Sequence, residues 1–208
     1  MAHYKVSVIM AAYNAEDTIE MALESIPDLP EVEIIVVDDG STDKTAQKAR
    51  KFGRAKLIMH DKNYGLGTAL NTGINESQGD YIVMLDADDD FYTQAFIDCL
   101  DELDGTDLVY FNLITNDGTI FDLTPNSKDI YCGQTKFMKS SFVGDSRYDE
   151  EALVAEDVPF WRELKEKNPT EKYTGVVVKH YNSPREGSLT WRRQNGEFDE
   201  FLASREDL

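Results

Sequence analysis

The first half of the chain alternates between short apolar runs and segments with helical spacing. Runs typical of buried strands occur at Lys5–Met10, Val32–Val37, Lys56–Met59 and Tyr81–Leu85. The segments between them space their apolar residues as helices do, and they cover Ile19–Ile26, Ser41–Phe52 and Thr68–Ser77. This alternation predicts an α/β fold with a mostly parallel central sheet and helices on both faces.

Polar residues and helix breakers predict where these helices begin and end. Asn14 is a candidate N-cap for the first helix, which Pro27 ends. Ser41 or Thr42 is expected to cap the second helix, and Gly53 stops it. For both of these helices, the residue expected to cap the helix follows shortly after the preceding strand.

The regular alternation breaks after a helix expected at Thr93–Leu103 and a strand expected at Leu108–Ile114. Asn116-Asp117-Gly118 predicts a hairpin turn, after which Thr119–Leu123 pairs back. Beyond it we expect helices at Gln134–Ser140, Glu156–Lys167 and Phe198–Leu202, a strand at Tyr173–Tyr181, and loops at Pro125–Ile130, Gly144–Glu151 and Asn182–Ser188. The prediction is one domain over residues 1–208, regular in 1–114 and smaller, partly antiparallel and irregular in 115–208.

The amino-acid composition indicates which partners the protein can bind and in which cellular compartment it is expected. Of the 208 residues 41% are hydrophobic and 29% are charged, which is typical of a globular protein. The net charge of −19 opposes binding to nucleic acid, so no nucleic acid partner is expected. Cys99 and Cys132 form no CxxC pair, which favours a reducing interior. The amino-terminal residues lead straight into a strand and no apolar run is long enough to span a bilayer, so a cytoplasmic protein without a spanning segment is expected.

The run Asp86-Ala87-Asp88-Asp89-Asp90 places four carboxylates directly after the strand at Tyr81–Leu85. A solvated acidic loop is one interpretation. An EF-hand is a second, but it fails because Phe91 and Ile97 occupy the positions that need a glycine and a glutamate. A metal–diphosphate site is the third, because strand carboxyl ends bind ligands in such sheets and carboxylates suit Mg²⁺ or Mn²⁺.

Three other places carry candidate chemistry, each with a simpler alternative. Asp38-Asp39 follows the second strand, where one carboxylate can accept from a base N–H or can simply cap a helix. Tyr13 can stack on a base or be an ordinary aromatic residue. Glu156-Asp157 opens a helix, where an acid suits the helix dipole but could also be a general base. Gly65-Leu66-Gly67 lacks the third glycine of a dinucleotide fingerprint, which leaves a turn that can approach a phosphate.

Four motifs in this order resemble the large inverting glycosyltransferase family 2, which has the GT-A fold. They are Val6–Asn14, Val36–Asp43, Asp86–Asp89 and Glu156–Trp161. The resemblance covers roughly Lys5–Trp161 and implies transfer of a sugar from a nucleotide-diphosphate donor, expected to be a UDP-sugar, to a hydroxyl of a sugar or glycan acceptor. It also implies that residues 1–114 hold the donor and residues 115–208 face the acceptor.

The same resemblance implies a role for individual residues. Asp157 would be the catalytic base, and Asp88 the direct ligand of Mn²⁺ or Mg²⁺. Asp86 would meet the ribose or the metal, and Asp39 the uracil ring. The remaining donor-binding positions are expected to be the Ala11 backbone, Tyr13, Gly65 and Ala87. His180 is a possible further metal ligand, although a structural histidine is the simpler interpretation.

Some features depart from the family and keep other functions open. Leu70 stands where many relatives have an arginine, so a cation for the diphosphate would come from Arg185 or Arg192. The stretch Gly65–Ala69 resembles the branch that glycosylates polyprenyl phosphates. That branch usually adds membrane-facing elements, and the sequence shows none, which leaves peripheral membrane association as the open alternative. A sugar-1-phosphate nucleotidyltransferase is a further alternative, although Ala11–Asp17 lacks the basic residues of its loop.

Overall fold

The computed structural model describes residues 3–125, 134–182 and 189–204. Its centre is a sheet that runs in the order β3-β2-β1-β4-β8-β6-β9-β5, and β7 pairs with β6 outside this path. The residues that pair in parallel outnumber those that pair antiparallel. The predicted α/β class with a largely parallel sheet is confirmed.

The parallel part of the sheet consists of the first four strands, with β1 in its middle. They are β1 (Val6–Ala12), β2 (Val32–Asp38), β3 (Lys56–Met59) and β4 (Tyr81–Met84). In β1, Ile9 aligns with Ile35 of β2 on one side and with Met84 of β4 on the other. β1, β2 and β4 are buried on both faces and therefore need continuous apolar runs, whereas the edge strand β3 is only partly buried.

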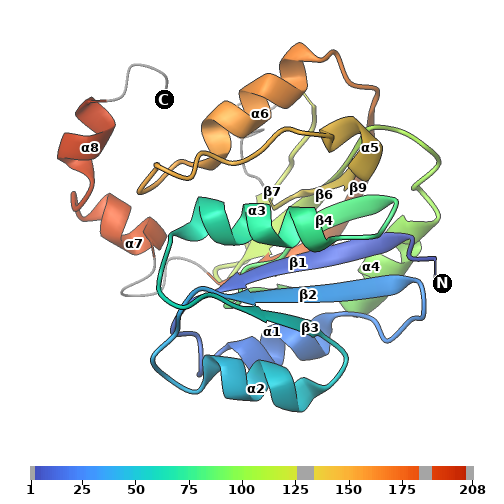
Figure 1. Cartoon of the computed structure of the whole chain (residues 1–208). Coiled ribbons are helices and arrows are strands. Elements are labelled where there is room, and N and C mark those ends of the chain that lie inside the picture. Colours follow the sequence, from blue (N-terminus) through green and yellow to red (C-terminus); the bar gives the residue numbers. More distant parts are fainter. Residues whose placement is uncertain (1–2, 126–133, 183–188, 205–208) are drawn as a thin grey trace.

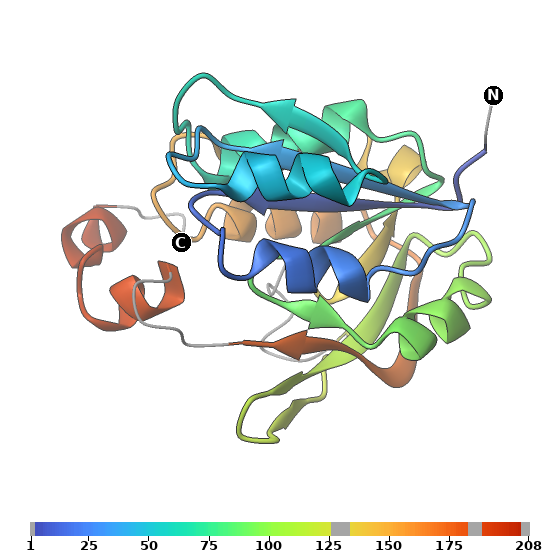
Figure 2. The same cartoon turned by 90° about the horizontal axis from the view of Figure 1, so that it is seen from below.

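Helices cover both faces of this sheet (Figures 1 and 2). One face carries α1 (Ile19–Ser25), α2 (Thr45–Phe52) and α4 (Thr93–Leu100); the other carries α3 (Leu66–Glu76), α5 (Ser140–Val143) and α6 (Asp157–Glu166). Alternate residues of β1 feed the two cores, because successive side chains of a strand point to opposite faces. Val8 packs with the α1 and α4 side, and Ile9 with the α3 and α6 side.

The second half of the sheet is mixed. β8 (Lys136–Lys139) runs antiparallel to β4 and to β6 (Leu108–Thr115), and β9 (Glu171–Tyr181) runs parallel to β6. The short strand β5 (Asp90–Phe91) pairs antiparallel with β9. The predicted hairpin is confirmed, since β7 (Ile120–Phe121) pairs back on β6.

The helix predicted at Gln134–Ser140 is wrong. This segment forms strand β8, and only Ser140 belongs to a helix, the short α5. Phe137 enters one core and Met138 enters the other, as a strand between two buried faces requires. The prediction was wrong because a short run of residues does not reveal its strand partners. Here β4 and β6 supply the hydrogen bonds that make the segment a strand.

Both predicted helix caps are also wrong. Asn14 has a positive φ of 50°, and its Oδ1 accepts from the backbone N–H of Thr42, so it joins two loops instead of starting α1. Ser41 Oγ accepts from the backbone N–H of Asn14. At the start of α2 it is Asp43 whose Oδ1 accepts from the N–H of Thr45.

The last part of the described chain forms α7 (Leu189–Gln194) and α8 (Asp199–Ala203), which stand off the carboxyl edge of the parallel strands in both views. The terminal helix was predicted and α7 was not. Cys99 is buried in the core as a free thiol. Cys132, Arg185 and most of the loops expected at Pro125–Ile130 and Asn182–Ser188 lie outside the described residues. None of the described helices combines the length and the apolar character needed to cross a bilayer.

Candidate active site

The carboxyl ends of β1, β2 and β4 meet at one edge of the sheet because these strands are parallel neighbours. The backbone N–H of Asp39 donates to Ala12 O at 2.8 Å, and the N–H of Leu85 donates to Ile9 O at 3.0 Å. Tyr13, which is 50% exposed, and Asp86 therefore follow directly on strands that flank one another. The residues predicted from three separate motifs share one edge, as the winding of such a sheet dictates.

The carboxylate of Asp39 is buried and held by donors from the segment after β3. Its Oδ1 lies 2.7 Å from Nδ1 of His60, and its Oδ2 accepts from the backbone N–H of Gly65 at 2.9 Å. The backbone N–H of Tyr64 also points at this carboxylate, at 3.0 Å from Oδ1. Nε2 of His60 in turn lies 3.1 Å from Oγ1 of Thr72 on α3. These contacts fix the carboxylate before any ligand arrives.

Two glycines allow the chain to close over Asp39. A Cβ on Gly40 would lie 2.4 Å from the backbone carbon of Lys62, so only glycine admits this close approach. Gly65 has a φ of 99°, a conformation that side chains disfavour, and it aims its N–H at Asp39. Beside this cradle, Oδ1 of Asp38 is buried without a hydrogen-bond partner in the described structure. A buried acceptor of this kind is normally satisfied by water or a ligand.

The acidic loop after β4 is held by side chains at the end of β9. Nζ of Lys179 lies 2.6 Å from Oδ2 of Asp89, and both side chains are almost completely buried. The backbone N–H of Asn182 donates to Oδ1 of Asp89 at 2.8 Å, and its Nδ2 donates to the carbonyl of Asp88 at 2.9 Å. The late strand therefore sets the shape of a loop some ninety positions earlier.

Asp86 lies on the inner side of this loop. Nε2 of Gln134 donates to its Oδ2, and Oε1 of the same Gln134 accepts from Lys179. Burial raises the pKa of Asp86 to about 7; Lys179 opposes this shift, whereas the charges of Asp89 and Asp88 add to it. A nearby cation would lower the pKa of a carboxyl group raised in this way, because it favours the charged form.

The start of α6 approaches the same place from the far end of the chain. Burial raises the pKa of Glu156 to about 7, and the charges of Asp157 and Asp86 raise it further, while Arg193 lowers it. Glu156 therefore lies within electrostatic range of both Asp86 and Arg193 of α7. The predicted convergence of the acidic loop with the Glu156-Asp157 pair is consistent with this coupling.

A single buried amide positions the segment that leads into α6. Nδ2 of Asn71 on α3 donates to the carbonyl of Tyr148 and to Oε1 of Glu150, each at 2.9 Å, and its Oδ1 accepts from the N–H of Tyr148 at 2.8 Å. The N–H of Asp149 then donates to the carbonyl of Glu156 at 3.3 Å. Helix α3 is thereby connected to the first residues of α6.

His180 contacts the end of the acidic loop. Its Nδ1 lies 3.0 Å from Oδ1 of Asp90, and within the described part of the chain no group of three or more His, Cys, Asp or Glu side chains is arranged to hold a metal ion. The carboxylates Asp86 and Asp88 nevertheless fit Mg²⁺ or Mn²⁺, which one or two carboxylates hold together with substrate phosphates. Two carboxylates would leave most positions of such an ion to water and to phosphate oxygens of a substrate.

Sequence reasoning missed the residues that hold the site together: His60, Asn71, Gln134, Lys179 and Asn182. A lysine inside an otherwise apolar β-branched strand was the one available signal, since such a charge needs a buried partner. Of the expected diphosphate cations, Arg192 is engaged with Glu197, its Nε 2.7 Å from Oε2. The neighbouring Arg193 is the one that acts on Glu156.

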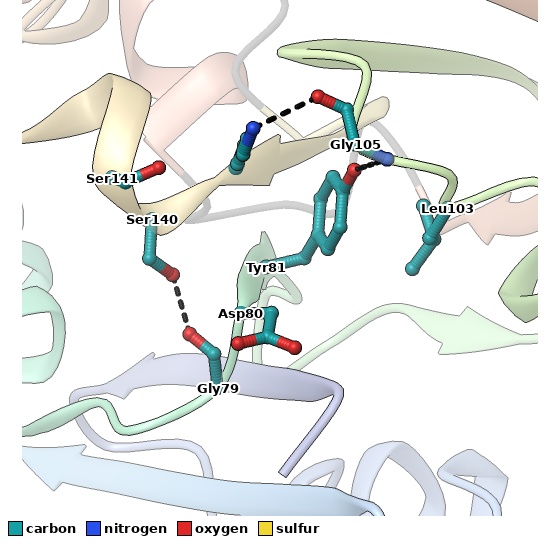
Figure 3. Close-up of a pocket in the computed structure, with 8 residues that line it drawn as sticks. Gly79, Asp80, Tyr81, Leu103, Gly105, Ser140 and Ser141 are labelled. Carbon is teal, nitrogen blue, oxygen red and sulfur yellow. Dashed lines mark hydrogen bonds between the residues drawn. The ribbon is translucent and has the colours of Figure 1, made fainter.

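Two hollows lie at the opposite edge of the sheet. Figure 3 shows the larger, of about 360 Å³, lined by Gly79, Tyr81 and Ser140 at the amino end of β4. Its polar atoms already bond to one another, because Ser140 Oγ donates to the carbonyl of Gly79 and the hydroxyl of Tyr81 accepts from the N–H of Gly105. A second hollow of about 260 Å³ adjoins it beside Arg147. Neither hollow touches the carboxylates described above.

Comparison with known proteins identifies the family of the chain. Residues 7–158 match the family described as "Glycosyl transferase family 2". The "Putative glycosyltransferase EpsH" of Bacillus subtilis is 32% identical over 158 residues, which are 68% of this chain and 44% of that protein. The chain thus spans less than half the length of this curated relative.

Solved structures agree with the fold. A crystal structure of S. aureus TarS 1–349 in complex with UDP-GlcNAc superposes with a TM-score of 0.77 and 26% identity, over 88% of this chain and 60% of that one. The mannosyltransferase PcManGT from Pyrobaculum calidifontis, in complex with GDP-Man and Mn²⁺, shares the fold with a TM-score of 0.71 at 17% identity, over 99% of this chain and 66% of that one. With the expected GT-A architecture confirmed and most of the chain matched by the family, the protein belongs to glycosyl transferase family 2.

Proposed function

We propose that this chain transfers a sugar from a nucleotide-diphosphate donor, a UDP-sugar, to a hydroxyl of a sugar or glycan acceptor with inversion at the anomeric carbon. The observation that carries the proposal is that Asp39 and Asp86 follow β2 and β4, the two parallel neighbours of β1, at one edge of the sheet. The charge of Asp86 also raises the pKa of Glu156, the neighbour of the candidate base, which supports a place for the start of α6 near this edge. The UDP-GlcNAc complex of TarS, a relative in fold and sequence, supports the choice of donor.

Residues at the carboxyl edge of the first two strands would bind the nucleoside. Tyr13 is exposed and offers a ring face for stacking, next to the Ala11 backbone. Asp39 would accept from the imide N–H of uracil, although His60, Tyr64 and Gly65 already occupy most of its acceptor capacity. Gly65 and Ala87 would flank the ribose and diphosphate.

A divalent cation, Mn²⁺ or Mg²⁺, would be held by Asp88 with Asp86 beside it, and His180 is a further candidate. When bound, such an ion supplies Lewis-acid stabilisation of the diphosphate leaving group. The Mn²⁺ complex of PcManGT, which shares only the fold with this chain, makes this a reasonable ion to test.

Asp157 would act as the general base. Its carboxylate would take the proton of the acceptor hydroxyl while that oxygen attacks the anomeric carbon from the face opposite the diphosphate. The bond from the anomeric carbon to the diphosphate oxygen breaks, and its electron pair leaves with the diphosphate. Residues 1–114 would thus hold the donor, and residues 115–208 would present the acceptor.

Replacing the base by its neutral isostere tests this assignment. Asp157→Asn should lower turnover by about 100-fold or more, since a general base contributes that much, and should leave UDP affinity within about threefold. Turnover is measured as release of UDP from UDP-sugars in the presence of Mn²⁺, and affinity by calorimetry.

Two further variants make this test specific. Asp98→Asn, on the exposed side of α4, is the matched control and should change neither quantity. If Asp157→Asn remains active while Glu156→Gln is inactive, the neighbouring acid is the base. If both variants turn over normally, the start of α6 plays no catalytic part.

A further inference from the structure

A lysine of β9 lies against the acidic loop Asp86–Asp90. Lys179 of β9 is fully buried, and its Nζ lies 2.6 Å from Asp89. Through Gln134, which accepts from Lys179 and donates to Asp86, the same lysine is connected to a second carboxylate of the loop. These contacts form one network, buried at Lys179 and Asp89 and partly buried at Asp86 and Gln134, that joins the four side chains.

The network divides the cluster into two parts. Asp89, which contacts the lysine directly, and Asp86, which is linked to it through Gln134, form the inner part. Asp88 and Asp90 form the outer part, where Asp88 is half-buried and Asp90 contacts His180. Four carboxylates at such short spacing repel one another strongly in a buried environment, and one internal positive charge offsets a large share of this repulsion.

The backbone keeps Lys179 in this position. Its residue pairs with Phe91 of β5 on one side and with Leu113 of β6 on the other, so the lysine lies within the sheet and not on a mobile loop. Asn182, three positions later, adds its bonds to Asp88 and Asp89. A cation held this rigidly acts as a permanent charge of the site.

We propose that Lys179 is a resident counter-cation that neutralises the inner carboxylates Asp86 and Asp89 and thereby weakens binding of a divalent metal in the absence of the donor. The metal then binds tightly only together with the diphosphate, whose oxygens supply the missing negative charge. Lys179 is accordingly a positioning residue of the metal–donor site. The inference rests on the proposed metal-dependent transfer.

The experiment measures Mn²⁺ affinity of the purified protein without nucleotide, by loss of the electron paramagnetic resonance signal of free Mn²⁺. Lys179→Met removes the resident charge and should bind Mn²⁺ roughly tenfold more tightly than the wild type. Asp89→Asn leaves the lysine uncompensated and should bind it roughly tenfold more weakly. The double variant restores the original balance of charge and should return to within about threefold of the wild type.

The double variant separates this role from two alternatives. If Asp89 were itself a metal ligand, the double variant would bind as weakly as Asp89→Asn, and the inference would be overturned. If Lys179 served only to stabilise the fold, Lys179→Met would bind no more tightly than the wild type, with the same consequence. Should Lys179→Met not fold, Asp89→Asn and the double variant still decide between these outcomes.

A control on the same strand accounts for general effects of lost charge. Lys172 of β9 pairs with Glu102 and Asp104 at the surface, and Lys172→Met should leave Mn²⁺ affinity within about twofold. The same titration repeated with UDP tests the underlying function. If the wild type binds no Mn²⁺ even with UDP, the metal-dependent function and this inference both fail; binding that is unaffected by Lys179 contradicts the inference alone.

Discussion

The two polar centres of the site are held in different ways. Asp39 is held from nearby in sequence, because His60 and Gly65 lie 21 and 26 positions after it. The acidic loop is held from far away, since Gln134 is 48 positions from Asp86 and Asn182 is 93 positions from Asp89. The first centre belongs to the regular parallel half of the sheet, and the second is completed only when the mixed half folds against it.

The Asp39 centre and the acidic loop therefore depend on different parts of the fold. A cradle made of consecutive strand–helix units forms with those units and is present whenever the first half is folded. A loop clamped by β9 depends on every pairing between β4 and β9, so its geometry reports on the whole sheet. We therefore expect substitutions at the joint between the two halves, where Asn71 of α3 bonds the segment before α6, to lower the free energy of unfolding most. Substitutions around Asp39 should lower it least.

The largest effect is expected at Asn71, which joins α3 to the segment before α6. Asn71→Ala removes three hydrogen bonds from a side chain that is 3% exposed, and it should lower the free energy of unfolding by about 2–4 kcal/mol. Denaturation in urea measures this loss. Asn75→Ala, one turn later on the same helix and bonded to Arg147 at the surface, is the control, with a loss of about 0.5 kcal/mol or less. Equal losses in the two variants would mean that the joint is not where the halves are coupled.

A smaller effect of opposite sign is expected at Glu156. Its pKa is raised to about 7 from 4.5, so between these values the folded protein binds more protons at this group than the unfolded chain does. Stability contributed by this group therefore falls as the pH rises from about 4.5 to about 7 and stays low above it. Glu156→Gln should consequently stabilise the metal-free protein by about 2 kcal/mol at pH 8 and hardly at all at pH 4.

Thermal unfolding in the presence of a chelator, followed across this pH range, measures the effect of Glu156→Gln. The control is Glu163→Gln on the same helix, whose side chain is half exposed and should give a curve close to that of the wild type. A stabilisation that does not depend on pH would show that the negative charge of Glu156 does not lower the free energy of unfolding.

The smallest effect on stability is expected at His60. His60→Ala removes the donor 2.7 Å from Asp39 and should cost about 1 kcal/mol of stability, with UDP affinity reduced roughly tenfold because the carboxylate is no longer fixed. His60→Asn keeps a short donor on the same side and should recover most of the affinity. Calorimetry with UDP compares the two variants. If they bind equally well, the orientation of Asp39 does not depend on His60.

Sequence periodicity located most of the elements in the first half and failed where the pairing is non-local. The strands at Val32–Val37 and Tyr81–Leu85 were readable because burial on both faces demands unbroken apolar residues. The segment Gln134–Ser140 was assigned as a helix because a short run does not reveal which partners it will bond to. The caps at Asn14 and Ser41 were misassigned for a related reason, since these side chains bond across to each other's loops.

The sequence by itself determined the class of fold and the family, and it singled out the acids to which roles are proposed, because strand ends, turns and motif order are local properties of a chain. Only the tertiary structure decided what surrounds those acids. The physical reason is that a buried charge is acceptable only beside a partner, and in this protein the partners Lys179, Gln134 and Asn182 come from strands and loops that meet the acidic loop only after the sheet has closed.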